Sequence, residues 1–253
     1  MKISENLSGR RISIELLAQL TGCQADALER WQPGSPRMAV TADAGRGELH
    51  LDGVIASDTT ADLYEDWLKI RMISPSRVRA ALAEIDGDVT MFINSPGGSV
   101  FDASAITAAL EDRAARTALH AVVSGLCASA ATMLALAGTT RRIAKMGMMM
   151  VHPSSASASG DSARMRKTAE VLDKIDDSYA QLIADAAGMA VEAVRSMVAA
   201  ETWLSAAECV DNGMMEDYYS PSSGDGDGGG AEAAATARSR MIRAIAEYDG
   251  LAA

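Results

Sequence analysis

Basic residues are scarce in this sequence relative to acidic ones. Lys and Arg together number 23 against 34 Asp and Glu, which gives a formal net charge of -11 at pH 7. Proteins that bind nucleic acids do so largely by neutralising phosphates with Lys and Arg. We therefore expect no nucleic acid as a partner.

Cysteine is also rare, and its positions lie far apart. Cys23, Cys127 and Cys209 are odd in number and contain no Cys-x-x-Cys pair, so they fit neither a disulfide framework nor a zinc site. This usage suits a reducing compartment. We expect a cytoplasmic protein that uses no metal or other cofactor.

Long apolar runs are missing as well. The N-terminal residues lack the continuous apolar stretch of a secretory signal. The longest apolar run elsewhere, at 128–137, is about half of the roughly 20 residues that a helix needs to cross a bilayer. We expect a soluble protein that does not bind membranes.

The chain also lacks a G-x-x-x-x-G-K-[ST] loop, the motif that binds ATP phosphates in many ATPases. ATP-driven unfolding of a substrate would therefore need another polypeptide.

The sequence does have the composition of a globular protein. Hydrophobic residues make up 48% and charged residues 23% of the 253 residues, which suits one packed domain with appendages. Changes in composition predict an N-terminal extension at 1–46, a main domain at 47–219, a Gly- and Ser-rich linker at 220–230 and a helical tail at 231–253. We expect the C-terminal part to be flexibly tethered and dispensable for catalysis.

Strand and helix patterns alternate through the main domain. The apolar run 89–93 precedes a Pro-Gly-Gly turn and a helix, and the strand 118–123 precedes a Ser-Gly turn and a small-residue helix at 128–137. Further helices are expected at 162–187, 191–199 and 205–211. Repeated strand-then-helix units predict an α/β fold with a mainly parallel sheet.

Two of these turns are suited to an oxyanion site, because backbone N–H groups at a glycine turn and at a helix start can point at one oxygen. Gly97 and Gly98 form the first turn, although such a turn is most often structural. Ser129 lies at the second, beside alanines that leave its hydroxyl accessible. A serine there is otherwise an ordinary helix cap, so a base must be found before it is assigned as a nucleophile.

Only three histidines can serve as that base. His50 lies in the first strand, before either turn, and His120 lies inside a strand among apolar neighbours. His152 follows the apolar strand 148–151, at the strand end where sites on parallel sheets are assembled. His152 is therefore the candidate base, against the alternative of a capping or core histidine.

Four segments, in order and with compatible spacings over roughly residues 48–217, resemble a known family. They are I-N-S-P-G-G-S-V at 93–100, S-G-L-C-A-S-A-A-T at 124–132, M-M-V-H-P at 149–153 and E-T-W-L-S-A-A-E-C-V-D-N-G at 201–213. The set resembles the Clp protease proteolytic subunit, and even more the Clp-like prohead maturation proteases of tailed phages and prophages. The resemblance implies the repeated β-β-α superhelix that Clp proteases share with crotonases.

The resemblance also implies a serine endopeptidase mechanism. Ser129 would attack the peptide carbonyl and His152 would take its proton. The backbone N–H groups of Gly97 or Gly98 and of Ala130 would bind the oxyanion.

The sequence departs from the family at the third member of the triad. The family's aspartate falls on Glu201, whose extra methylene changes the reach of the carboxylate. The alternative acids are Asp173, Asp176 and Asp177 on the long helix.

A second departure is Cys127, which lies at a position that is often alanine in the family. We expect it to be a buried thiol.

Four functions fit these features. The one that we favour is an endopeptidase acting on phage capsid or scaffold proteins, in the bacterial host cytoplasm if it is phage-encoded. The second is a Clp-type subunit that works with a separate AAA+ unfoldase, and the third is a crotonase-like acyl-CoA enzyme. The fourth is an inactive ring subunit or assembly scaffold. The resemblance also implies a homo-oligomeric ring.

Overall fold

The computed structural model describes residues 39–68 and 71–220. Residues 1–38 of the expected extension, the expected linker beyond Ser220 and the expected tail lie outside the described residues. Within the expected extension, β1 (Val40–Asp43) pairs antiparallel with β2 (Glu48–Asp52), and Ala39 and Val40 are buried in the core. The sheet therefore begins before the boundary expected after residue 46.

The described residues form one eight-stranded sheet, and it is mainly parallel, as the alternating pattern predicts. Its hydrogen-bonded order is β1-β2-β3-β4-β5-β8, with β6 paired to β4 and β7. The remaining strands are β3 (Val89–Ser95), β4 (Leu119–Ala128), β5 (Thr140–Ala144), β6 (Met148–Val151), β7 (Thr202–Ser205) and β8 (Asp217–Tyr219). Only the β1–β2 and β6–β7 pairs are antiparallel among these described strands.

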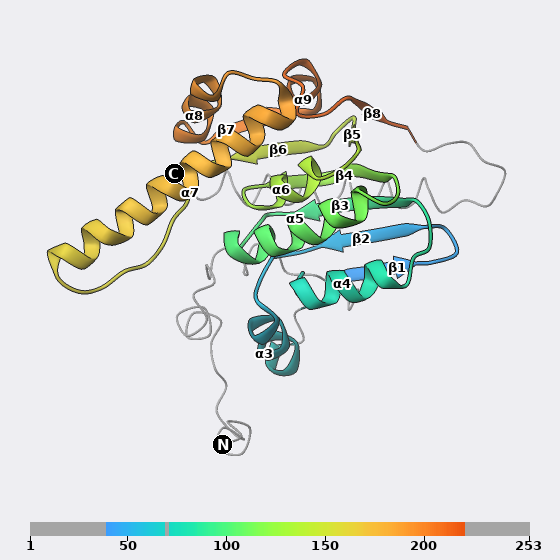
Figure 1. The fold of residues 1–253 in the computed structure, drawn as a ribbon, viewed down its shortest axis with the longest axis horizontal. Coiled ribbons are helices and arrows are strands. Elements are labelled where there is room, and N and C mark those ends of the chain that lie inside the picture. The colour runs from blue at the N-terminus through green and yellow to red at the C-terminus, as the bar shows by residue number, and fades with distance from the viewer. Residues whose placement is uncertain (1–38, 69–70, 221–253) are drawn as a thin grey trace.

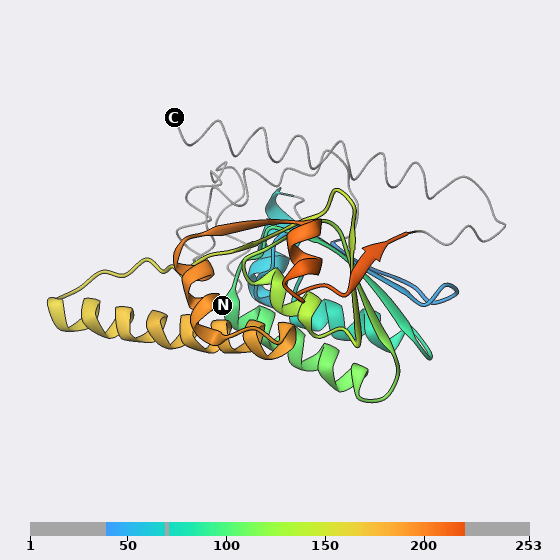
Figure 2. The same cartoon turned by 90° about the horizontal axis from the view of Figure 1, so that it is seen from above.

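Helices cover one face of this sheet. α4 (Pro75–Ala83), α5 (Val100–Ala114) and α6 (Ala131–Leu136) lie against β1 to β4, and α3 (Asp58–Leu68) contacts α4 (Figure 1). The other helices are α7 (Ser162–Ala187), α8 (Val191–Ala199) and α9 (Ala206–Asp211). The N-terminal half of α7 projects beyond the body of the domain (Figures 1 and 2).

Local capping signals fix the ends of α7. The Asp161 side chain accepts a hydrogen bond from Arg164 N–H at 2.9 Å, which satisfies one of the N–H groups exposed at the helix start. Gly188 follows the helix with φ 67°, a left-handed conformation that glycine adopts without a steric cost. The bounds expected for α7 and α8 from the sequence are confirmed.

The small-residue segment after β4 differs from the expected helix at 128–137. β4 continues through Ala128, and α6 begins only at Ala131. Residues 126–128 pair with residues 148–150 of β6. This pairing satisfies the backbone groups of the segment and outweighs the helix propensity of alanine. Ser129 therefore lies in the turn between a strand and a helix, not in the helix itself.

None of the helices in the described part of the chain has the length and apolar character of a membrane span.

Candidate active site

The two turns that the sequence singles out are in contact. The glycine turn follows β3, and the Ser129 turn follows the neighbouring strand β4. A Cβ on Gly97 would lie 2.6 Å from the Ala128 carbonyl oxygen and 2.8 Å from Ser129 Cβ. Any side chain at residue 97 would therefore push the two turns apart, and Gly97, with φ 94°, has a conformation that glycine tolerates best.

Ser129 has a strained backbone that projects its side chain from the turn. Its φ is 54°, and its N–H donates to the Met150 carbonyl at 2.7 Å, which extends the β4–β6 pairing by one bond. In the described ranges, Ser129 and Glu201 are the only residues other than glycine with positive φ. Such conformations cost on the order of 1–3 kcal/mol each and are concentrated at functional sites.

His152 reaches Ser129 directly. It follows β6, which runs parallel to β4, so the ends of these two strands lie at the same edge of the sheet. His152 Nε2 lies 2.8 Å from Ser129 Oγ, and both side chains are half-buried. A proton can pass from the hydroxyl to the imidazole at this distance.

Two backbone N–H groups beside Ser129 are available to a substrate. Gly97 N–H is already used, because it donates to Ser95 Oγ at 3.1 Å. Within the described residues, neither Gly98 N–H nor Ala130 N–H has an acceptor. The Ala130 nitrogen lies next to the glycine turn, 3.1 Å from where a Cβ on Gly97 would be. Of the two glycines, Gly98 is the one whose N–H can pair with that of Ala130.

Glu201 directly precedes β7, the strand that pairs with β6. β7 begins at Thr202, which pairs with Val151 in β6. His152 follows the paired residues of β6 by one residue, and Glu201 precedes those of β7 by one. The Glu201 side chain is exposed, and its φ is 49°.

The alternative acids on α7 have other interactions in two of three cases. Asp177 forms an ion pair with Arg195 at 3.1 Å. Asp176 Oδ1 accepts a hydrogen bond from Ser154 N–H at 2.7 Å and so fixes the segment that follows His152. Asp173 is exposed.

Cys127 is fully buried in β4, as expected. Burial raises the pKa of the Cys127 thiol far above its ordinary value. The thiolate form that a cysteine nucleophile needs is therefore not populated at neutral pH.

The other two histidines have partners elsewhere in the sheet. The His50 ring stacks on Phe92 in β3, and His120 Nδ1 lies 2.8 Å from Thr140 Oγ1 in β5. Of the three histidines, His152 is the one that contacts Ser129.

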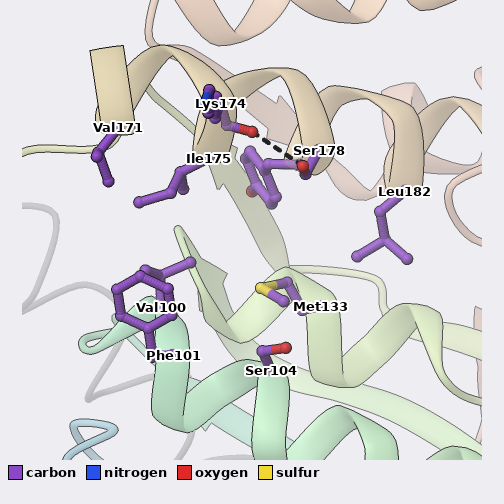
Figure 3. A pocket seen from close by; sticks show the side chains of 10 residues that line it. Val100, Phe101, Ser104, Met133, Val171, Lys174, Ile175, Ser178 and Leu182 are labelled. Carbon is purple, nitrogen blue, oxygen red and sulfur yellow. Dashed lines mark hydrogen bonds between the residues drawn. The ribbon is translucent and has the colours of Figure 1, made fainter. Parts of the chain in front are cut away.

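A pocket of about 360 Å³ lies between α5, α6 and α7. Figure 3 shows apolar side chains from all three helices around it, among them Val100, Met133, Ile175 and Leu182. Tyr179 also lines it, and its hydroxyl lies 3.1 Å from the Ser129 carbonyl oxygen. No local signal in the sequence marks the contact of Tyr179 with Ser129, which lies 50 residues away.

Comparisons with known proteins give one consistent result. The sequence model of the Clp protease family matches residues 78–220, more than half of the chain. A protein of Prochlorococcus marinus named ATP-dependent Clp protease proteolytic subunit 1 is 25% identical over 197 residues, covering 72% of this chain and 94% of its own length. A Ligilactobacillus salivarius protein named ATP-dependent Clp protease proteolytic subunit is 29% identical over 171 residues, covering 61% and 86%. A protein of the same name from Bacteroides fragilis is 26% identical over 176 residues, covering 67% and 80%.

Proposed function

The chain belongs to the Clp protease family, and from that premise we propose that it is a serine endopeptidase with Ser129 as nucleophile and His152 as general base. One observation carries the proposal: the 2.8 Å contact between His152 Nε2 and Ser129 Oγ. Two available N–H groups beside the hydroxyl support it. The contact between Ser129 and His152 also argues against the acyl-CoA enzyme and the scaffold, because neither of these functions needs a paired serine and histidine.

The reaction proceeds in two halves. Ser129 Oγ attacks the carbonyl carbon of the peptide bond, and its proton moves to His152 Nε2. The N–H groups of Gly98 and Ala130 hold the oxyanion of the tetrahedral intermediate, while Gly97 keeps the two turns in contact. The C–N bond then breaks, and His152 returns the proton to the leaving amine. Water, deprotonated by His152, releases the acyl group and restores Ser129.

A direct test is the hydrolysis of short fluorogenic peptides by the purified full chain. We expect each cleaved amide bond to yield one new carboxylate and one free amine, and the release of that amine with the fluorophore is read as fluorescence. Enoyl-CoA hydration without peptide hydrolysis would favour the crotonase-like alternative, and no turnover of either substrate class would favour the scaffold.

We propose Glu201 as the acid that orients His152, and this predicts a graded effect. Glu201→Gln should lower kcat/KM on the order of 10²-fold, less than loss of the serine or histidine, because an orienting group makes no bond to the substrate. The measurement is steady-state hydrolysis of a fluorogenic peptide, with the melting temperature as a check on folding.

Aspartate variants of α7 are the matched controls for this prediction. Asp173→Asn, Asp176→Asn and Asp177→Asn remove one charge each without shortening the side chain. If Glu201→Gln behaves like the wild type and one of these three is inactive, the orienting acid belongs to α7.

For the biological substrate we propose proteins of an assembling phage head. The four-segment resemblance supports this, as does the chain that continues past the family match, at 221–253. A Clp-type subunit served by a separate unfoldase is the second candidate, favoured by the relatives' names, which describe an ATP-dependent protease. We propose that the reaction takes place in the cytoplasm, which is that of the bacterial host if the chain is phage-encoded.

Folded capsid and scaffold proteins distinguish these two candidates. Head maturation predicts limited cleavage of assembled head proteins by the chain alone, without ATP. The second candidate predicts that folded proteins stay intact until an AAA+ unfoldase and ATP are added, although short peptides are cleaved in both cases.

We also propose that copies of the chain assemble into a ring. The projecting half of α7 supports this, because Met165 and Val171 are each 41% exposed, whereas the buried residues of α7 lie between Tyr179 and Ala184. A second copy would cover these apolar side chains. Light scattering should show a closed oligomer, and a fully active monomer at micromolar concentration would overturn the proposal.

A further inference from the structure

The Ser129 carbonyl oxygen is the acceptor of three hydrogen bonds. Thr132 N–H donates to it at 3.0 Å and Thr132 Oγ1 at 2.8 Å. The Tyr179 hydroxyl approaches the same oxygen at 3.1 Å from α7. The two hydroxyl oxygens lie 2.6 Å apart, and either of them can be the donor in this contact.

This carbonyl belongs to the same peptide unit as the Ala130 N–H. A peptide unit is planar, and in the trans form its C=O and N–H point in opposite directions. Whatever fixes the direction of the Ser129 carbonyl therefore fixes the direction of the Ala130 N–H. Hydrogen bonds to the carbonyl also polarise the unit and make its N–H a stronger donor.

The two hydroxyl groups are placed to hold that direction firmly. Thr132 is fully buried and Tyr179 is 8% exposed, so water does not compete for these bonds. Burial raises the pKa of Tyr179 far above its ordinary value, and the phenol stays a neutral donor at any working pH. A turn with φ 54° at Ser129 is strained, and strained turns persist only where the surroundings hold them.

We propose that the hydroxyl pair of Thr132 and Tyr179 positions the oxyanion site: by holding the Ser129 carbonyl, it aims the Ala130 N–H at the oxygen that becomes negative in the transition state. The inference rests on the proposed function. Neither hydroxyl touches the substrate, so both residues are positioning residues. Because Tyr179 also lines the pocket between α5, α6 and α7, one side chain joins the pocket wall to the Ser129 turn.

The experiment removes each hydroxyl and keeps the shape of the side chain. Tyr179→Phe and Thr132→Val should each lower kcat on the order of 10-fold and leave KM within about twofold, because the lost interaction acts on the transition state. The affinity of a peptide aldehyde, which forms a tetrahedral adduct with the serine, should fall by the same factor as kcat. Thr132→Ser keeps the hydroxyl and should restore activity to near the wild-type value.

Matched controls separate positioning from general loosening of the fold. Tyr218→Phe, at an exposed position of β8, and Thr168→Val, at a half-buried position near the start of α7, delete the same groups away from Ser129 and should be unchanged in kcat. In the double variant Tyr179→Phe/Thr132→Val, the loss should be smaller than the product of the single losses, because both hydroxyls act on one oxygen.

The outcomes separate this inference from the proposed function. If the wild type cleaves peptides and both single variants keep wild-type kcat and aldehyde affinity, the positioning role is wrong and the peptidase assignment stands. If KM rises while kcat is unchanged, the two residues only shape the pocket, and the inference is again wrong. A wild type with no peptidase activity overturns both.

Discussion

Replacing Ser129 by alanine is expected to lower peptide hydrolysis by roughly 10³-fold or more and to leave the fold intact. The substitution removes the oxygen that attacks the peptide carbonyl, and nothing else near it can replace that oxygen: the neighbouring thiol of Cys127 is buried and protonated. Alanine keeps the Cβ of serine, so the strain of the left-handed turn is nearly unchanged. Steady-state hydrolysis of a fluorogenic peptide measures the loss, and circular dichroism during heating checks the fold.

The matched control is Ser196→Ala, which deletes a hydroxyl that donates to the Glu192 carbonyl on α8. This variant should hydrolyse peptides at the wild-type rate. If Ser129→Ala, confirmed by mass spectrometry, retains near-normal turnover, Ser129 is not the nucleophile.

Replacing His152 by alanine should cost about as much, again roughly 10³-fold, because the serine and the histidine act as one unit. Without the imidazole, the Ser129 proton has no acceptor in place, and the leaving amine has no donor. The double variant Ser129→Ala/His152→Ala should be scarcely slower than either single variant. Its kcat/KM, measured beside those of the single variants, tests this non-additivity.

His120→Gln is the control for this second prediction. His120 contacts Thr140 in β5 and lies outside the proposed catalytic pair. We expect this variant to be fully active if it folds. Should His152→Ala keep its activity while His120→Gln loses it at an unchanged melting temperature, the base has been assigned to the wrong histidine.

The strand-and-helix order of the main domain could be predicted because its signals are local. The apolar runs at 89–93 and 148–151 form β3 and β6, and a helix pattern with a terminal glycine gives the bounds of α7. Alanine-rich sequence misled the assignment after β4. Helix propensity is a local property, whereas the pairing of residues 126–128 with β6 depends on a strand about 20 residues further along the chain.

The catalytic pair of the candidate site could also be predicted from local motifs, whereas its backbone details could not. Ser129 and His152 could be named from motifs at strand ends, and the structure brings their reactive atoms to 2.8 Å. The sequence left Gly97 and Gly98 as equal candidates, since only the hydrogen bond from Gly97 N–H to Ser95 Oγ distinguishes them. The positive φ of Ser129 was hidden too, because serine has no preference for that conformation.

The contact of Tyr179 with the Ser129 turn could not be predicted from spacing. Periodicity places Tyr179 on the buried face of a helix, but it does not say which residues that face covers. The hydroxyl pair joins residues that are 47 positions apart, and its geometry depends on where α7 crosses α6. Such pairs are visible only once the packing of the helices is known.

The central claim is that Ser129 is an activated nucleophile, and covalent labelling tests it most directly. The purified full chain is treated with a fluorophosphonate probe and digested, and the modified peptide is sequenced by mass spectrometry. We predict a single adduct on the Ser129 hydroxyl, absent from Ser129→Ala and strongly reduced in His152→Ala. An adduct on another residue, or no adduct on protein that cleaves peptides, would contradict the account.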